Sequence, residues 1–155
     1  MTLDIGCGET KDGGIGLDVR KISSVDIIGD IGVLPFRDNS FDCVYSSHVI
    51  EHFSHRGFCN IVSVWVRVLK NEGIVESSIL ILVQARAPTW QNVEKFTGGQ
   101  DYRDSYHKCG FSFDLLKSMI ELSGVIKLKR IISGYKGIPF IPDQFYIKGV
   151  KKMRI

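Results

Sequence analysis

Short apolar runs alternate with small polar turns along the first third of the chain. Four of these runs are Leu3 to Gly6, Ile15 to Val19, Val25 to Ile28 and Phe41 to Ser46. Gly, Asp, Asn or Ser residues stand between them, which is the pattern of buried strands separated by tight turns. The pattern therefore predicts four strands before residue 47.

After the four predicted strands, the spacing of the apolar residues becomes helical. Apolar residues recur every three or four positions from His48 to about Lys70, which predicts an amphipathic helix that Gly57 breaks or bends. Asn71-Glu72-Gly73 is a plausible C-cap for it. A fifth strand is expected from Ile74 to Val83, interrupted by the polar Glu76-Ser77-Ser78.

The last third of the chain begins with a long polar and aromatic segment, residues 84–110, that lacks either periodicity. Loops of this length in a compact domain are usually functional or disordered. The hydroxyl of Ser112 suits the N-cap of a second helix that runs to about Ser123 and ends at Gly124. Two final strands are expected at Ile126 to Ile132 and Gln144 to Lys148.

This alternation of strands and helices predicts an α/β fold: a compact, Rossmann-like, doubly wound and mostly parallel seven-stranded sheet. A length of 155 residues fits a single domain, so we expect residues 1–155 to form one unit. A composition of 44% hydrophobic and 24% charged residues is that of an ordinary globular protein, and disordered and fibrous classes are disfavoured.

Charge, apolar run length and cysteine content indicate the compartment of the protein and the classes of partner it contacts. The net charge is only +3, whereas a nucleic-acid-binding protein usually has a larger and clustered basic excess. The longest apolar run, Ile79 to Val83, is far shorter than the roughly 20 residues of a membrane helix. No secretory signal is evident, and the four cysteines form no Cys-x-x-Cys pair. We therefore expect a cytoplasmic protein with reduced thiols that contacts neither membrane nor nucleic acid.

The ends of the first three strands carry residues suited to ligand binding. Gly6 and Gly8 follow the first strand and allow a close approach of the backbone to a ligand. Asp18 ends the second strand, where a carboxylate can accept hydrogen bonds from ribose hydroxyls, and Asp30 follows the third. Each feature is weak alone, but ligands of such folds bind beyond the carboxyl ends of the strands, so three in succession indicate a site.

These motifs resemble those of the class I S-adenosylmethionine-dependent methyltransferases, with a type 11-like domain. Leu3 to Gly8 resembles the family's first motif, Asp18 its ribose-binding acid, Asp30 to Asp42 its adenine-side segment, and Ser46 to Phe53 the segment that flanks the methyl donor. The resemblance implies S-adenosylmethionine as cofactor. It implies a cofactor site composed of Asp4, Gly6, Cys7, Gly8, Asp18, Val19, Asp30, Ile31, Ser46 and Ser47.

The chain departs from the family in the connection after its first strand. Only Glu9 to Gly14 separate Gly8 from Ile15, too few residues for the usual helix. Without a helix N-terminus, and with the negative Glu9 and Asp12, this connection is poorly suited to a dinucleotide pyrophosphate. Relatives with such a shortened connection resemble enzymes of glycan gene clusters, which suggests a sugar acceptor.

Two histidines are candidates for a general base. His48 follows the fourth strand, and His107 lies among aromatic residues of the 84–110 segment. The alternative for each is a hydrogen-bonded surface or hinge histidine. His48, His52 and His55 would share one helical face, but no acid or thiolate completes a metal site there, so none is expected.

The leading functional interpretation is therefore O- or N-methylation of a small molecule or glycan, with residues 84–110 as a lid over the acceptor. The alternative is a non-catalytic module that keeps the fold and regulates a partner. A base-methylating enzyme is disfavoured, since Ser46-Ser47-His48 stands where an Asn/Asp-Pro-Pro-Tyr/Phe motif is expected. A homodimer is possible.

Overall fold

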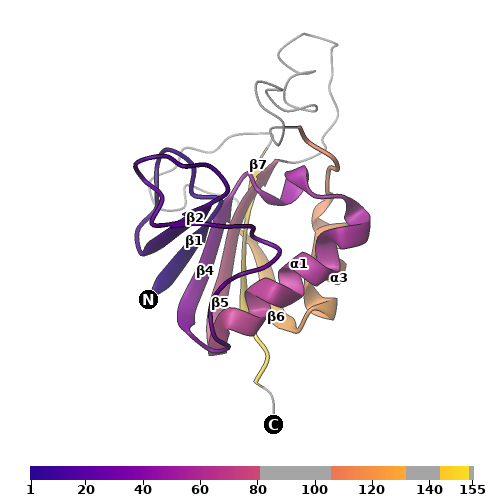
Figure 1. Ribbon diagram of the computed structural model, residues 1–155. Helices are drawn as coiled ribbons and strands as arrows, with labels where there is room; N and C mark the ends of the chain where they lie inside the picture. The colour runs from indigo at the N-terminus through magenta and orange to yellow at the C-terminus, as the bar shows by residue number, and fades with distance from the viewer. Residues whose placement is uncertain (81–105, 132–143, 154–155) are drawn as a thin grey trace.

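The computed structural model describes residues 1–80, 106–131 and 144–153, and its centre is one seven-stranded sheet (Figure 1). The strand order is β3-β2-β1-β4-β5-β7-β6. The strands are β1 (Thr2–Ile5), β2 (Ile15–Asp18), β3 (Ile27–Ile28), β4 (Phe41–Ser47), β5 (Leu69–Leu80), β6 (Val125–Ile131) and β7 (Gln144–Lys151).

All pairs from β3 to β5 are parallel, and β7 runs antiparallel to both of its neighbours. The expected Rossmann-like, mostly parallel seven-stranded sheet is confirmed. The chain winds outward from β1 to β3 and then returns to the other side of β1 with β4. The carboxyl ends of β1 and β4 therefore flank a topological switch point, where α/β folds bind ligands.

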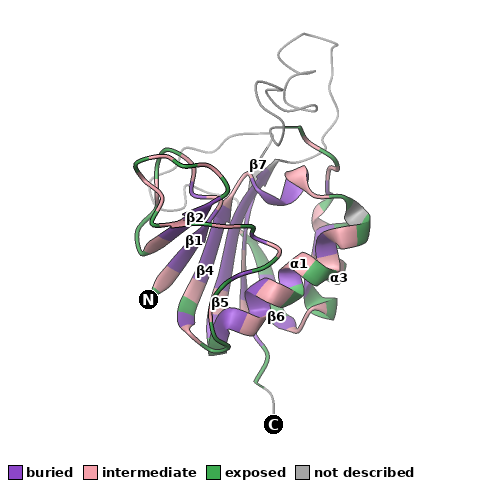
Figure 2. Ribbon diagram, viewed as in Figure 1, coloured by how far each residue is buried: buried purple, intermediate pink, exposed green. Residues whose placement is uncertain are grey.

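The helices α1 (His55–Val68) and α3 (Phe113–Leu122) lie on the same face of the sheet (Figure 1). Alternate strand residues such as Leu3, Ile5 and Val44 point toward these helices and are fully buried. Phe58 and Trp65 of α1 pack into the same core. Figure 2 shows the resulting pattern, with buried positions along the strands and on the inner side of α1.

The first helix begins later than expected. His48 has a left-handed backbone (φ 52°), and a short 3-10 turn, η1 (Ile50–His52), separates it from α1. Ser54, in an extended conformation, is the N-cap residue of α1. The expected helical face shared by His48, His52 and His55 therefore does not exist. Gly57 lies in the first turn of α1 and does not break it.

The end of α1 and the start of β5 also differ from expectation. The helix ends at Val68 without a C-cap at residues 71–73, and β5 begins at once with Leu69. The irregularity falls between the pairs Phe41–Leu69 and Cys43–Ile74, where Glu72 has a φ of 61°. The polar residues 76–78, expected to interrupt the strand, pair regularly with β4 and β7.

The remaining elements lie close to their predicted positions. Ser112 is the N-cap of α3, and its side chain accepts a hydrogen bond from the backbone N–H of Leu115. β3 is shorter than expected, and β7 is longer. Most of the expected lid, through residue 105, lies outside the described residues. No helix in the described part of the chain is long and apolar enough to cross a membrane.

Candidate functional site

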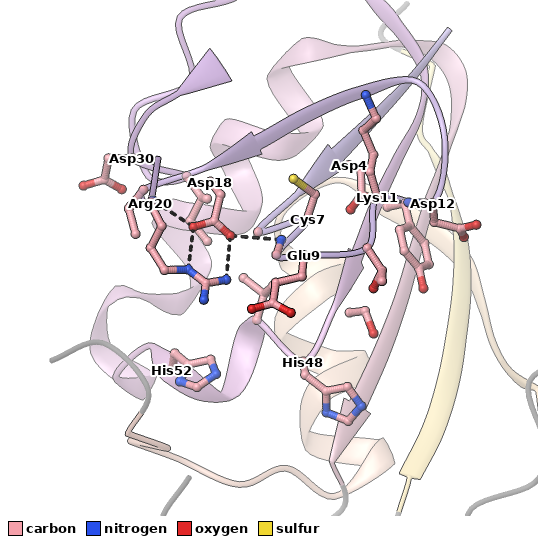
Figure 3. Close-up of a pocket in the computed structure, with 18 of the residues that line it drawn as sticks. Asp4, Cys7, Glu9, Lys11, Asp12, Asp18, Arg20, Asp30, His48 and His52 are labelled. Atoms are coloured by element: carbon pink, nitrogen blue, oxygen red, sulfur yellow. Dashed lines mark hydrogen bonds and ion pairs between the residues drawn. The ribbon is translucent and has the colours of Figure 1, made fainter. Parts of the chain in front are cut away.

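A cavity of about 750 Å³ opens at the carboxyl ends of β1, β2 and β4. Its size falls within the roughly 300–1,000 Å³ of small-molecule sites. Figure 3 shows Asp18, Arg20 and Asp30 gathered at one end and His48 at the other. The lining residues are Asp4, Gly6, Cys7, Gly8, Glu9, Thr10, Lys11, Asp12, Asp18, Val19, Arg20, Asp30, Ile31, Tyr45, Ser47, His48, Val49, His52, Phe53 and Lys108.

The glycine turn after β1 forms the floor of the cavity. Gly6 and Gly8 have left-handed backbones, with φ of 64° and 57°. A side chain at Gly6 would meet a methyl carbon of Val49 at 2.5 Å, so any larger residue would be excluded there. The backbone N–H of Gly6 donates to the carbonyl of Leu17 at 2.7 Å, which closes the turn against β2.

Carboxylates take the place of the missing helix in holding the short connection from residue 9 to residue 14. The buried carboxylate of Asp4 accepts from the backbone N–H of Asp12 at 2.6 Å. Asp26 accepts from the backbone N–H of Gly16 and from the Lys11 ammonium, both at 2.7 Å. The connection is thereby tied to β1 through Asp12 and to the segment before β3 through Lys11.

Asp18 lies at the end of β2, and its carboxylate already accepts four hydrogen bonds. Oδ2 accepts from the backbone N–H of Gly8 at 3.0 Å and from Arg20 Nη2 at 3.3 Å. Oδ1 accepts from the backbone N–H of Arg20 at 2.9 Å and from its Nε at 3.1 Å. These bonds use the roughly four lone-pair sites of a carboxylate. Burial opposes ionisation of Asp18, but the bonds from Arg20 and Gly8 outweigh burial and lower its pKa.

The segment after β3 carries Asp30 and Ile31 to the same end of the cavity. Asp30 is exposed, and one of its carboxylate oxygens accepts from the backbone N–H of Gly32 at 2.7 Å. The indole N–H of Trp65 donates to the carbonyl of Ile31 at 3.1 Å. Arg67 donates to the carbonyls of Leu34 and Phe36 at 2.9 and 2.7 Å. Helix α1 therefore fixes this segment by side-chain bonds to its backbone.

The opposite end of the cavity combines His48 with a buried acid. Glu51, only 1% exposed, contacts His48 Nδ1 through Oε1 at 3.1 Å. The backbone carbonyl of Glu51 accepts from the N–H groups of Lys108 and Cys109, at 2.7 and 3.2 Å. These bonds join the C-terminal end of the 84–110 segment to η1 and bring Lys108 to the cavity wall.

Ten of the twelve residues expected to bind cofactor or act in catalysis line the cavity, and two do not. Those ten are Asp4, Gly6, Cys7, Gly8, Asp18, Val19, Asp30, Ile31, Ser47 and His48. Ser46 is fully buried on the helix side of β4, and its hydroxyl donates to Ser77 at 2.9 Å. His107 does not line the cavity either, and its ring centroid lies 4.9 Å from that of His52.

Sequence reasoning missed several residues of the site. Arg20 follows Asp18 by two positions, and an arginine so near an expected ligand-binding acid was an available signal. Glu51 directly precedes His52, but no acid was expected to contact the histidines of this segment. Lys108 reaches the cavity through contacts distant in sequence, for which no local pattern exists.

Cys7 lines the cavity but is unsuited to a nucleophilic role. Its burial, together with the nearby charges of Asp4 and Asp18, raises its pKa to about 11. The thiolate is the nucleophilic form of cysteine, and at neutral pH Cys7 is a thiol. All four cysteines are free.

Known proteins of similar sequence and structure were compared with this chain. A family model described as a methyltransferase domain matches residues 16–76. An uncharacterised protein of Methanocaldococcus jannaschii is 28% identical over 158 residues, which cover 89% of this chain and 69% of that protein. The match therefore extends beyond the segment that the family model covers.

Solved structures match almost the whole chain. A possible histamine N-methyltransferase of Thermotoga maritima has a TM-score of 0.67 at 16% identity, covering 97% of this chain and 82% of its own. Phosphoethanolamine N-methyltransferase 2 of Haemonchus contortus, in complex with S-adenosyl-L-methionine, has a TM-score of 0.71 at 16% identity, covering 98% of this chain and 48% of its own. The chain has the fold of these methyltransferases.

Proposed function

We propose that this chain, which has the fold of class I methyltransferases and matches the methyltransferase family model over residues 16–76, binds S-adenosylmethionine and methylates a small molecule or glycan. The observation that supports this proposal most strongly is the convergence of the glycine turn, Asp18 and Asp30 on one cavity at the switch point. The ends of three successive strands thereby bring two carboxylates and a glycine backbone, which a ligand can approach closely, to the same cavity.

The residues of the cavity fit this cofactor in kind and in place. Gly6 and Gly8 leave room for the methionine portion, Asp18 accepts from the ribose hydroxyls, and Asp30 and Ile31 hold the adenine. When bound, the cofactor supplies a methyl carbon on a positively charged sulfur. The cavity is lined by five acidic residues, Asp4, Glu9, Asp12, Asp18 and Asp30, and by three basic ones, Lys11, Arg20 and Lys108. This excess of negative charge favours a cationic ligand over a phosphate-bearing one.

We propose that the acceptor enters at the end of the cavity near Tyr45, Ser47 and His48. His48 is the base of choice there because it lines the cavity, whereas His107 does not. Holding an acceptor in line with the methyl group contributes on the order of 7–11 kcal/mol through proximity and orientation. A cytoplasmic location and a homodimer remain predictions.

The alternative, a non-catalytic module, is favoured by one observation. The Asp18 carboxylate that should accept from ribose is already bonded to the Arg20 side chain through Nε and Nη2. If the Arg20 side chain does not leave Asp18, the cavity has the shape of the family's site but cannot bind the cofactor. Ligand binding therefore distinguishes the two functions.

The test is calorimetry with S-adenosylhomocysteine, the demethylated product. We expect Asp18→Ala to weaken binding by about 1.5–3 kcal/mol, or roughly 10- to 150-fold, because hydrogen bonds to a charged group are lost. Asp26→Ala is the matched control, because Asp26 also ties down the short connection but does not line the cavity. No binding by the folded wild type would refute the cofactor, and equal losses in both variants would assign the effect to the connection.

A further inference from the structure

Glu51 is a buried acid at the acceptor end of the cavity that the proposed function does not yet use. It lies in η1, it is 1% exposed, and it does not line the cavity itself. A buried carboxylate is costly unless it is paired and hydrogen-bonded. Its position therefore requires a partner, and Oε1 contacts His48 Nδ1 at 3.1 Å.

The backbone around this pair is constrained on both sides. His48 holds a left-handed φ of 52°, which is unfavourable for a residue with a side chain, and its N–H donates to the carbonyl of Ser78 at 3.0 Å. The carbonyl of Glu51 accepts from Lys108 and Cys109. Strained backbone of this kind persists where surrounding contacts enforce it, often at functional sites.

The charges near the pair keep Glu51 in its carboxylate form. Burial opposes ionisation, but the hydrogen bond and the charge of His48, with a smaller effect of His107, outweigh burial and lower the pKa of Glu51. The same carboxylate, added to burial, raises the pKa of the Cys109 thiol. Glu51 is therefore an acceptor at neutral pH, and an acceptor at Nδ1 selects the imidazole tautomer with its proton there.

We infer that Glu51 is a positioning residue, which holds His48 with its proton on Nδ1 so that Nε2 takes a proton from a hydroxyl acceptor. This inference rests on the proposed function and narrows its acceptor to a hydroxyl. With the cofactor bound, the hydroxyl proton would pass to Nε2 and the acceptor oxygen would form its new bond to the methyl carbon that the cofactor supplies. The carbon–sulfur bond would break with its electron pair left on the sulfur. Solvent then takes the proton from His48.

His52 provides an internal comparison for this role. It also lines the cavity, but its Nδ1 contacts the backbone carbonyl of Tyr106 at 3.0 Å and not a carboxylate. A neutral carbonyl orients an imidazole without the charge that stabilises a protonated ring. Of the two cavity histidines, His48 is thus the one provided with a negative partner.

The first measurement is the tautomer of His48 by nitrogen-detected NMR of the protein, both with and without S-adenosylhomocysteine. We expect the Nδ1–H form to dominate in the wild type, and a mixture of both forms in Glu51→Gln, with partial recovery in Glu51→Asp. Glu76→Gln is the matched control, since Glu76 is also buried but pairs with Tyr146 and Lys148, and none of these three residues lines the cavity. It should leave the His48 tautomer unchanged.

The second measurement is the rate at which diethyl pyrocarbonate, an electrophile that reacts with the bare ring nitrogen, modifies His48 relative to His52. We expect the ratio to fall several-fold in Glu51→Gln and not in Glu76→Gln. An Nε2–H tautomer in the wild type, or an unchanged tautomer and ratio in Glu51→Gln, would overturn the inference. The His48 measurements without ligand do not depend on cofactor binding. Absence of S-adenosylhomocysteine binding would therefore refute the proposed function and leave the test of Glu51 intact.

Discussion

Asp18 and Arg20 form an ion pair at the end of the cavity where a ribose is expected. The guanidinium spans both oxygens of the carboxylate and lies 3.4 Å from the position that a side chain on Gly8 would take. A ribose whose hydroxyls donate to this carboxylate must displace the Arg20 side chain. The ion pair and the proposed ligand therefore compete for one group.

The first prediction follows from this competition. Arg20→Ala should bind S-adenosylhomocysteine more tightly than the wild type, by about 1 kcal/mol or roughly fivefold, because an ion pair whose Arg20 side chain is about one-third exposed no longer has to be broken. Calorimetry at moderate salt measures the difference. Lys21→Ala, which removes an adjacent exposed charge, should leave the affinity unchanged.

The opposite sign would be equally informative. Weaker binding by Arg20→Ala would mean that the guanidinium moves onto the ligand and contributes to holding it. Arg20→Lys separates the cases further, since it keeps the charge but lacks the two-pronged geometry of guanidinium. An intermediate gain of affinity is expected for it.

The glycine turn after β1 could be predicted from the sequence, because its left-handed backbone at Gly6 and Gly8 favours glycine. Ser46 was expected in the cofactor site but does not line the cavity, because successive side chains of a strand point to opposite faces. Its neighbours Tyr45 and Ser47 line the cavity, whereas Ser46 lies on the core face. The motif identified the strand end, but only the register decides which of its residues face the ligand.

At the scale of elements, helix α1 connects the core of the domain with the site. Its inner face packs against the sheet, and Trp65 and Arg67 near its end bond the backbone of residues 31–36. This segment lacks regular structure between β3 and β4, so its carbonyls depend on such side chains. The helix therefore holds the proposed adenine-side segment in place.

The second prediction concerns this connection. Arg67→Met keeps the apolar stem but removes the donors to Leu34 and Phe36, so we expect a loss of about 1 kcal/mol of stability and a several-fold loss of S-adenosylhomocysteine affinity. Urea denaturation and calorimetry measure the two effects. Lys70→Met removes a nearby surface ion pair with Asp42 and should change neither by much. Unchanged affinity in Arg67→Met would show that the segment is held without α1.

Element boundaries were predicted less well than the elements themselves, and the errors have physical causes. The apolar spacing before α1 continues through η1, so periodicity alone could not show that the chain turns at His48. The signal that was available is Ser54, an N-cap residue type directly before the true helix start. In β5, Glu76 was taken as an interruption, but Tyr146 and Lys148 satisfy its charge from the adjacent strand.

At the scale of the whole molecule, the fold was predictable because strand–helix alternation and right-handed crossovers leave few arrangements of a parallel sheet. The position of the cavity then follows from the switch point between β1 and β4. What alternation could not supply is the set of long-range contacts that completes the cavity. Lys108 and Glu51 meet across more than fifty residues of sequence, and their hydrogen bond joins backbone atoms that carry no side-chain signal.

The last prediction tests whether the domain as a whole responds to the proposed ligand. A ligand that binds only the folded state adds about 2.7 kcal/mol at a concentration of 100 times its Kd. For a domain of this size, each 1 kcal/mol raises Tm by roughly 2–4 °C, so S-adenosylhomocysteine should raise it by about 5–11 °C. Differential scanning calorimetry provides the measurement. Asp18→Ala should show a much smaller shift at the same concentration, whereas Asp26→Ala should keep most of it.

The dinucleotide NAD is the matched ligand control, because it also contains adenosine but carries a pyrophosphate. The connection after β1 provides no helix N-terminus for that group, and Glu9 and Asp12 place two negative charges along the cavity. We therefore expect NAD to leave Tm unchanged at concentrations where S-adenosylhomocysteine shifts it. A larger shift with NAD would mean that the cavity accepts phosphates despite these carboxylates, and it would replace methyl transfer with dinucleotide binding as the function of this site.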